Sequence, residues 1–292
     1  MQGADPWMAQ DASLRRRDTD PMPIAPRISP RDQARTKDRL TEYDTARARA
    51  GRPFVPTGER ALDSALRSLA ARLPRAARGV VAIPEMPGPA GVPDLVAIPS
   101  PDGLTARLRC NVPPLLIWGD ALVAASVSAA RPESVRTIAA RSGLRDDVVK
   151  RRLRRLASIG AVSQTHGGRY VRNTALAPIG RIYALEAKVD NWSSGIGQAL
   201  RYGAWADASG VVLAHLPSDR SKALAQATSL GVGLAVGARW LVRPRIHAHG
   251  SARRLWASEH VLAALELSTP RIGARPTPDD LLTTNPRPSH RS

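Results

Sequence analysis

The sequence predicts an α/β fold that is interrupted by a smaller helical unit. Short apolar runs typical of buried strands alternate with stretches of helical periodicity over most of residues 57–267. Between residues 113 and 173 this alternation gives way to three consecutive helical segments and a short hairpin. We therefore expect a discontinuous α/β domain, formed by residues 57–112 and 174–267, that carries the unit 113–173 as an insert.

The first part of the α/β domain is predicted to be one helix followed by two strands. Thr57 is a suitable N-cap, and leucines at helical spacing follow it until Pro74 ends the helix. Extended runs over residues 79–83 and 94–98 flank a turn rich in proline and glycine. A further run, 104–112, alternates only weakly, and whether it joins the sheet stays open.

The second part returns to strands and helices in alternation. Apolar runs predict strands at 181–189, 211–216, 232–236 and 240–247, and helical spacing predicts helices at 194–207, 222–229 and 251–267. When the insert and its lead-in are set aside, the leading elements follow the order helix, strand, strand, strand, helix, strand. This order defines a topology that can be compared with known folds.

The two ends of the chain have a different composition. Residues 1–56 are rich in Arg, Asp and Pro and lack a sustained apolar period, so we expect a mobile basic arm with a short helix around residues 32–49. Residues 268–292 are polar and punctuated by proline, and we expect a disordered tail there.

Composition narrows the class of protein. The 292 residues contain a single cysteine, Cys110, which excludes a disulfide framework and a multi-thiolate zinc site. No apolar run is long enough to span a bilayer, and residues 1–20 lack the apolar stretch of a secretory signal. We therefore expect a cytoplasmic protein that does not enter membranes, and we leave homodimerisation open.

The charge of the chain suggests the kind of partner. Lys and Arg number 43 against 25 Asp and Glu, a formal net charge of +18, which favours binding to a polyanion such as DNA. A compositional bias of the genome is an alternative explanation, because only four of these basic residues are lysines. The position of the charges along the chain is therefore more informative than their sum.

The insert has the pattern of a helix-turn-helix. A helix over residues 133–141 and a helix over 146–158 are separated by a sharp turn at Gly143, and a hairpin at 161–171 follows them. This segment resembles the winged helix-turn-helix of many bacterial regulators. The resemblance implies that DNA is contacted by the basic residues of the third helix and the wing, which are Arg145, Lys150, Arg151, Arg152, Arg154, Arg155 and Arg169. The alternative is a winged helix used for protein contacts, with solvated arginines.

A second pattern involves charged residues at the ends of predicted strands. Asp94 follows Val92 and Pro93 at the start of one strand, whereas Glu186 and Lys188 close another and point to the same face of it. Two carboxylates that converge from neighbouring strands form a hard oxygen site suited to Mg²⁺, and a lysine beside them can orient the attacking water. The alternative is a surface Glu–Lys pair at a strand end.

These residues, together with the order of elements, resemble the PD-(D/E)XK nuclease superfamily. The resemblance implies a restriction-endonuclease-like mixed sheet with an αβββαβ core. It also implies that Asp94 and Glu186 are metal ligands, that the Ala187 carbonyl is a further ligand, and that Lys188 serves the water or the developing charge. Glu59, at the head of the first helix, corresponds to an additional acidic ligand of some members, although an acid is favoured at a helix N-terminus in any case.

A third motif extends the resemblance to the RecB-like members. Gln198 and Tyr202 stand four residues apart on one helix face, in the QxxxY pattern. In those members the two residues lie near the metal site and support it or contact DNA. The resemblance covers residues 58–236 apart from the insert, and the insert itself is the departure from the pattern.

The sequence therefore predicts a DNA-binding nuclease that hydrolyses phosphodiester bonds with Mg²⁺ or Mn²⁺. The main alternative is a non-catalytic winged-helix transcriptional regulator on an inactive nuclease-like scaffold. A further alternative is a component that acts through a partner protein. The position of the Asp94, Glu186 and Lys188 side chains relative to one another decides between a common site and unrelated surface charges.

Overall fold

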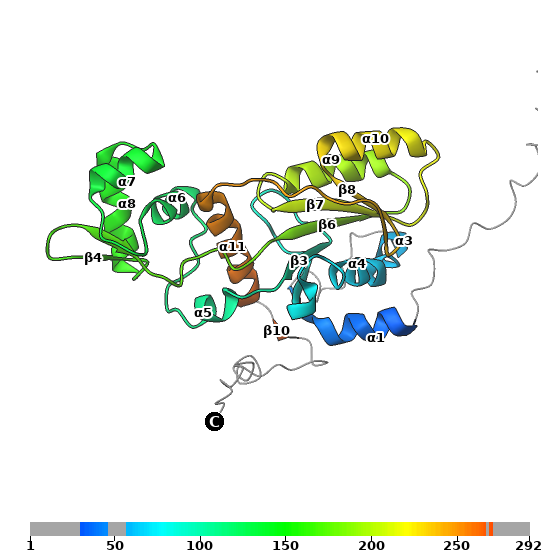
Figure 1. The fold of residues 1–292 in the computed structure, drawn as a ribbon, viewed down its shortest axis with the longest axis horizontal. Coiled ribbons are helices and arrows are strands. Elements are labelled where there is room, and N and C mark those ends of the chain that lie inside the picture. Colours follow the sequence, from blue (N-terminus) through cyan, green and yellow to red (C-terminus); the bar gives the residue numbers. More distant parts are fainter. Residues whose placement is uncertain (1–29, 46–56, 267–268, 271–292) are drawn as a thin grey trace, which may run out of the picture.

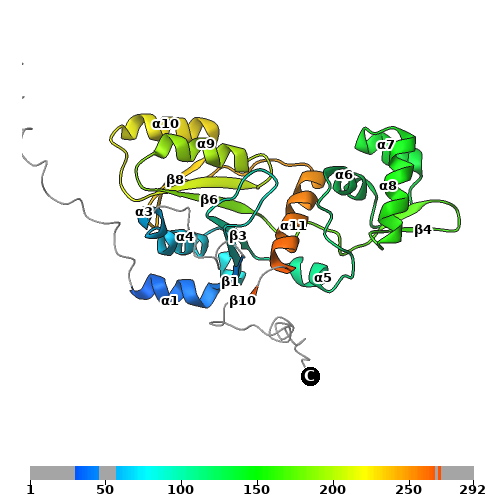
Figure 2. The same ribbon diagram turned by 180° about the vertical axis from the view of Figure 1, so that it is seen from behind.

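The computed structural model describes residues 30–45, 57–266 and 269–270, and it has an elongated shape (Figure 1). The α/β domain occupies one end and the helices of the insert occupy the other, with α11 (Ser251–Glu266) between them (Figures 1 and 2). In this part of the chain no helix combines the length and the apolar character needed to cross a membrane.

A mixed sheet is the centre of the α/β domain. In the described residues its strands follow the order β10-β1-β2-β3-β6-β7-β8-β9. β2 (Val80–Pro84), β3 (Leu95–Pro99) and β6 (Tyr183–Lys188) are antiparallel neighbours, whereas β7 (Ala208–Leu213) and β8 (Gly233–Val236) continue parallel to β6. β9 (Arg239–Val242) closes this edge as a hairpin with β8.

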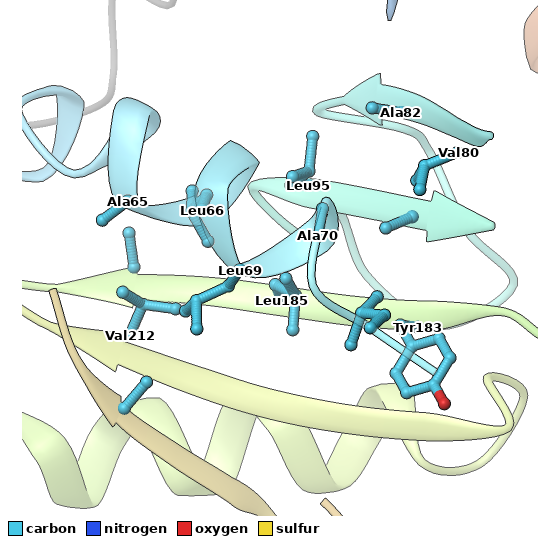
Figure 3. Close-up of a cluster of buried hydrophobic side chains, with 14 of the residues drawn as sticks. Ala65, Leu66, Leu69, Ala70, Val80, Ala82, Leu95, Tyr183, Leu185 and Val212 are labelled. Carbon is cyan, nitrogen blue, oxygen red and sulfur yellow. The ribbon is translucent and has the colours of Figure 1, made fainter. Parts of the chain in front are cut away.

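Helices cover both faces of this sheet. α4 (Asp63–Ala70) packs its leucines on one face against β2, β3 and β6, which forms the apolar cluster drawn in Figure 3. On the opposite face α9 (Trp192–Tyr202) and α10 (Arg220–Leu230) pack on β7 and β8, and α11 packs on β2 and β3. The predicted order of helix, strand, strand, strand, helix, strand is confirmed as α4-β2-β3-β6-α9-β7.

One predicted helix is divided in the structure, and the run that the sequence left open does not join the sheet. The helix expected from Thr57 to Pro74 is broken into α3 (Thr57–Arg60) and α4, with a turn between them. The weakly alternating run 104–112 is not a strand, because its first half forms α5 (Leu104–Leu108). Arg107 of α5 is buried against Glu259. The pattern of apolar residues along the sequence cannot predict this long-range ion pair.

The described part of the predicted arm forms a helix and a strand, and the helix overlaps the short one expected around residues 32–49. α1 (Pro30–Arg39) is followed by β1 (Leu40–Asp44), which pairs parallel to β2 and extends the sheet. β1 is half-buried along its whole length and therefore shows no alternation of apolar and polar residues. The rest of the arm, residues 1–29 and 46–56, lies outside the described residues.

The predicted tail also contributes to the sheet. Its two described residues form β10 (Thr269–Pro270), which pairs antiparallel with β1 at the edge of the sheet. The prediction of disorder over 268–292 is therefore wrong at 269–270, and the remaining residues of the tail lie outside the described part of the chain.

The insert contains the predicted three helices and hairpin. These elements are α6 (Trp118–Ser126), α7 (Val135–Ser142), α8 (Asp146–Ser158), β4 (Val162–Gln164) and β5 (Tyr170–Arg172). Their apolar side chains form a separate cluster, which also receives Leu255 from α11. Because other residues of α11 belong to the core of the α/β domain, this helix connects the two units.

The insert joins the sheet at a single end. The chain leaves the end of β3 at Pro99 and returns to the start of β6 at Tyr183, and these two positions are adjacent because the strands are antiparallel. A Cβ at Gly180 would lie 3.1 Å from the Ile98 side chain, which shows how close the two connections are. The other end of the same strands, where β3 begins and β6 ends, carries Asp94 and Lys188.

Candidate active site and nucleic-acid surface

The pairing of β3 with β6 brings Asp94 and Glu186 together. Leu95 is opposite Leu185 in this ladder, and extending the register by one residue pair places Asp94 opposite Glu186. Residues directly opposite each other in an antiparallel pair project from the same face. Both side chains are buried, with 8% and 4% of their surface exposed. The sheet therefore holds two carboxylates side by side, in agreement with the strand periodicity of the sequence.

Pro93 explains why the ladder stops at this point. The same register would place Pro93 opposite Ala187, but proline has no N–H to donate to the Ala187 carbonyl. The Ala187 N–H instead donates to Asp94 Oδ2 at 2.7 Å. Since the N–H and C=O of one strand residue point to the same side, the Ala187 carbonyl faces the Asp94 side of β6. Asp94 thus lies beside the Ala187 backbone as well as opposite Glu186.

Lys188 neutralises part of this negative charge. Its Nζ atom is 3.0 Å from Glu186 Oε1 and 3.1 Å from Glu59 Oε1, and 13% of its side chain is exposed. Burial alone would lower the pKa of Lys188, but the two carboxylates outweigh burial and raise it. Lys188 is therefore protonated at neutral pH.

Tyr202 holds the other oxygen of Glu186. Its hydroxyl is 2.8 Å from Glu186 Oε2 and 3.2 Å from the Val92 carbonyl oxygen, so its single proton is best donated to the nearer carboxylate. Burial raises the pKa of Tyr202, and the charges of Glu186 and Asp94 raise it further. Tyr202 therefore keeps its proton and remains a donor.

Gln198 lies one turn before Tyr202 on α9. Its Oε1 atom is buried and has no hydrogen-bond partner among the residues that the structure describes. A buried acceptor without a donor is costly, which makes this amide a candidate for contact with water or a bound group. The QxxxY motif thus supplies one donor, which is used by Glu186, and one acceptor, which is free.

A residue that the sequence prediction missed sets how closely α9 approaches the site. A Cβ at Gly195 would lie 2.7 Å from Val211 Cγ1 and 3.0 Å from Lys188 Cγ. Glycine at this position lets the helix lie directly on β6 and β7. Glycine destabilises the interior of a helix unless close packing requires it. A glycine inside the predicted helix could therefore have indicated close packing at Gly195 from the sequence alone.

The predicted metal ligands are brought together only in part. Asp94 and Glu186 are opposite each other and Asp94 accepts from the Ala187 N–H, whereas the carboxylate of Glu59 contacts the Lys188 ammonium. Over residues 30–45, 57–266 and 269–270 there is no group of three or more His, Cys, Asp or Glu that could hold a metal ion. Two carboxylates are nevertheless a donor set that Mg²⁺ uses, since it keeps several waters as ligands.

The insert presents part of its basic surface to solvent. Lys150, Arg151 and Arg154 are exposed, and their spacing places them on one face of α8. Arg169 is exposed in the loop of the hairpin. Arg145 is exposed as well, and it lies 3.5 Å from the carboxylate of Asp147, which is itself solvated.

Arg152 and Arg155 also contact a buried acid of the insert, which the sequence does not indicate. Arg152 Nη1 is 2.6 Å from Asp120 Oδ1, and Arg155 Nε is 3.3 Å from Asp120 Oδ2. Asp120 is buried at the start of α6, and the Arg152 guanidinium lies against Gly119 beside it. Arg152 therefore joins α8 to α6 inside the insert, whereas Arg155 remains partly exposed.

Glu133 is a second buried acid that the sequence prediction did not single out. The sequence places it at the start of the second helix, but that helix begins at Val135, and Glu133 forms a β-bridge with Tyr170. Both of its oxygens accept from Arg141, at 2.8 Å each, and this contact lowers the pKa of Glu133. The ion pair ties α7 to the hairpin.

Comparison with protein-family models, with curated proteins and with solved structures found no match to this chain. The chemistry of the site therefore rests on the geometry of its own residues.

Proposed function

We propose that this chain is a DNA-binding, metal-dependent nuclease that acts in the cytoplasm and hydrolyses phosphodiester bonds. The observation that carries the proposal is the meeting of Asp94 and Glu186 on one face of neighbouring strands, with the Lys188 ammonium 3.0 Å from Glu186. Buried charges are costly, and such a group persists when it serves a ligand or a reaction. The arrangement supports the resemblance to the PD-(D/E)XK superfamily and its restriction-endonuclease-like core.

Asp94, Glu186 and the Ala187 carbonyl would hold the Mg²⁺ or Mn²⁺ ion. When bound, such an ion acts as a Lewis acid on the phosphate and makes a water more acidic. Tyr202 fixes the orientation of the Glu186 carboxylate through its 2.8 Å hydrogen bond. The free acceptor of Gln198 would orient a water by accepting one of its protons.

Lys188 would act through its charge. Because the pKa of Lys188 is raised, the ammonium stays protonated and can donate a hydrogen bond to the attacking water or to a phosphate oxygen. An ammonium group has three N–H donors, and Glu59 and Glu186 accept from two of those of Lys188. The third N–H is therefore the one available to substrate.

DNA would be held by the insert as a winged helix-turn-helix. Lys150, Arg151 and Arg154 form a basic stripe on α8, and Arg169 extends it to the wing. Contacts of this kind neutralise phosphates and supply affinity that falls with salt.

The alternative function is a non-catalytic winged-helix regulator on an inactive nuclease-like scaffold. One observation favours it: within the described ranges no three metal-ligating side chains are grouped, since Glu59 is engaged by Lys188. In that case Lys188 would only stabilise the end of β6, and the α/β domain would serve as a scaffold.

The test is a nicking assay on supercoiled DNA with purified full-length chain and either Mg²⁺ or Mn²⁺. We expect cleavage that is lost on chelation and that falls at least about 100-fold in Asp94→Asn and in Lys188→Ala. Asp102→Asn is the matched control, because Asp102 is exposed beyond the opposite end of β3 and should leave cleavage unchanged.

The binding of DNA by the same variants separates the two functions. Retained binding in Asp94→Asn and Lys188→Ala, together with lost cleavage, supports the nuclease. Binding by the unmodified chain without cleavage of supercoiled, linear or single-stranded DNA, at any metal concentration tested, would overturn the nuclease and favour the regulator.

A further inference from the structure

A cavity of about 750 Å³ lies on the α4 face of the sheet, at the amino end of β6. The candidate active site is at the carboxyl end of that strand, which is roughly 16 Å away over five residues. We call the cavity the arginine pocket. Its lining includes Arg72, Arg181, Tyr183, Arg239, Trp240 and Arg243.

The arginine pocket carries positive charge without a matching carboxylate. Four arginines line it, and no Asp or Glu among the described residues does. Arg72 is held by carbonyl oxygens of Ser68 and Ala238 and therefore has a structural contact. Arg181, Arg239 and Arg243 are exposed, and none of them forms an ion pair within the described part of the chain. Three guanidinium groups around one hollow attract an anion.

Tyr183 adds a donor that lacks an acceptor. Its side chain is 1% exposed, and within the described residues no group accepts its hydroxyl proton, although the Arg181 guanidinium lies beside the hydroxyl oxygen. Figure 3 shows the hydroxyl pointing away from the leucines of the cluster. Burial raises the pKa of Tyr183, although the nearby Arg181 opposes this, so the hydroxyl keeps its proton. Asp207 also acts on Tyr183, but it accepts from the Ile182 N–H and pairs with Arg254.

Trp240 gives the pocket a flat apolar wall. A Cβ at Gly210 or Gly233 would lie 3.0 Å or 2.7 Å from the indole ring, so the ring rests on bare backbone of β7 and β8. The indole is half-buried and lines the pocket beside Pro244. A planar group can stack on such a surface.

We propose that the arginine pocket binds a nucleoside phosphate, with the phosphate on Arg181, Arg239 and Arg243 and the base on Trp240. The Tyr183 hydroxyl donates to a phosphate oxygen. The volume is that of a pocket for a ligand of this size. Because the pocket is on the other face and at the other end of β6, this site is separate from the proposed nuclease site.

The probes are adenosine monophosphate, adenosine and inorganic phosphate, titrated by calorimetry into full-length chain. The Asp94→Asn variant in a metal chelator is used, so that the nuclease site does not contribute. We expect adenosine monophosphate to bind, and both fragments to bind at least tenfold more weakly. Arg243→Gln should weaken binding about tenfold and Tyr183→Phe severalfold, whereas Arg220→Gln on α10 should have no effect.

A 5′-phosphorylated tetranucleotide distinguishes a free nucleotide from a strand end. Tighter binding of the tetranucleotide, with the same loss in Arg243→Gln, identifies a strand end as the source of the phosphate. Weaker binding identifies the free nucleotide. No binding of either probe at millimolar concentration, or binding that Arg243→Gln and Tyr183→Phe leave unchanged, would overturn the proposal. The nicking activity of Arg243→Gln is measured in parallel. Lost nucleotide binding with unchanged nicking shows that the arginine pocket and the proposed nuclease site are tested separately.

Discussion

Lys188 stays buried because two carboxylates share its charge. Its ammonium lies between Glu59 and Glu186, and the Tyr202 hydroxyl takes the remaining Glu186 oxygen. Removing one member of such a group leaves the others without compensation, which is more costly than removing two together. The contribution of the site to stability is therefore strongly non-additive.

A double-mutant cycle tests this coupling. Lys188→Met should lower the free energy of unfolding by about 2–3 kcal/mol, because Glu59 and Glu186 then face each other unneutralised. Adding Glu186→Gln should recover part of this loss. Urea unfolding of the two single variants and the double variant measures the coupling, and strictly additive effects would contradict it.

The meeting of the site residues could be predicted from strand periodicity and from the motif. Asp94, Glu186 and Lys188 converge as expected because each stands at the end of a strongly apolar strand. The contacts of Glu59 and Asp120 could not be predicted. Each depends on a partner more than 30 residues away, and sequence spacing says nothing of such pairs.

Among the elements, α8 has the boundaries that the sequence predicts, but its arginines do not all make the contacts that the sequence suggests. Its boundaries agree with the prediction because Val149, Leu153 and Leu156 repeat at helical spacing and are buried. Its arginines, however, divide between two roles. Arg151 and Arg154 face solvent, whereas Arg152 turns inward to Asp120, and only the packing of α6 against α8 reveals this.

Charge reversal should separate these two roles. Arg151→Glu with Arg154→Glu should weaken DNA binding and reduce the slope of affinity against salt concentration by about one for each phosphate that is no longer neutralised, with the fold intact. Arg152→Glu should instead destabilise the insert, because it places a second acid beside buried Asp120. Affinity and thermal unfolding are measured on both. Equal effects of the two variants on folding would contradict the assignment.

The Glu133–Arg141 pair predicts how the insert responds to acid. The folded pKa of Glu133 is below its ordinary value of 4.5, so its contribution is complete above that value and is lost as the pH falls through the folded pKa. Glu133→Gln should lower stability by about 1–2 kcal/mol at pH 7. The difference between the variant and the unmodified chain should shrink as the pH falls below 4.5 and through the folded pKa of Glu133. A difference that is constant with pH would contradict this.

α1 and β1 show why part of the sheet escaped prediction. β1 has the sequence LTEYD and is half-buried throughout, so neither face is apolar enough to give alternation. It is fixed by a bidentate ion pair in which Arg67 of α4 donates to Glu42, at 2.6 and 2.7 Å. The position of a polar strand of this kind is set by tertiary contacts.

At the scale of the whole molecule, a buried ion pair joins the two units. Arg107 of α5 and Glu259 of α11 are 1% and 0% exposed and contact each other at 2.6 Å. Glu259 also accepts from the Leu115 N–H, and Arg107 donates to the Val112 carbonyl, so the chain entering the insert is bound to α11. No periodicity in the sequence indicates this link.

Breaking this pair should affect both units at once. Glu259→Ala leaves the Arg107 charge buried without a partner and should lower the free energy of unfolding by about 3–5 kcal/mol. Amide hydrogen exchange should accelerate in α8 and in β6 together, because α11 packs in both cores. Glu266→Gln, at the exposed end of the same helix, is the control. Faster exchange confined to one unit would contradict a shared helix.

The attachment of the insert has a geometric consequence for the nuclease that we propose. The insert joins the strands at one end and the acidic residues stand at the other, so the basic face of α8 is separated from Asp94 and Glu186 by the depth of the sheet, roughly 20 Å for a strand of six residues, and by α11 in addition (Figure 1). The depth of the sheet alone corresponds to about six base pairs of rise, so the offset along a duplex is larger than that. Because the helix between the two units is anchored by a buried charge pair, this offset is built in, and scission at a constant number of nucleotides from the bound stretch would be its signature.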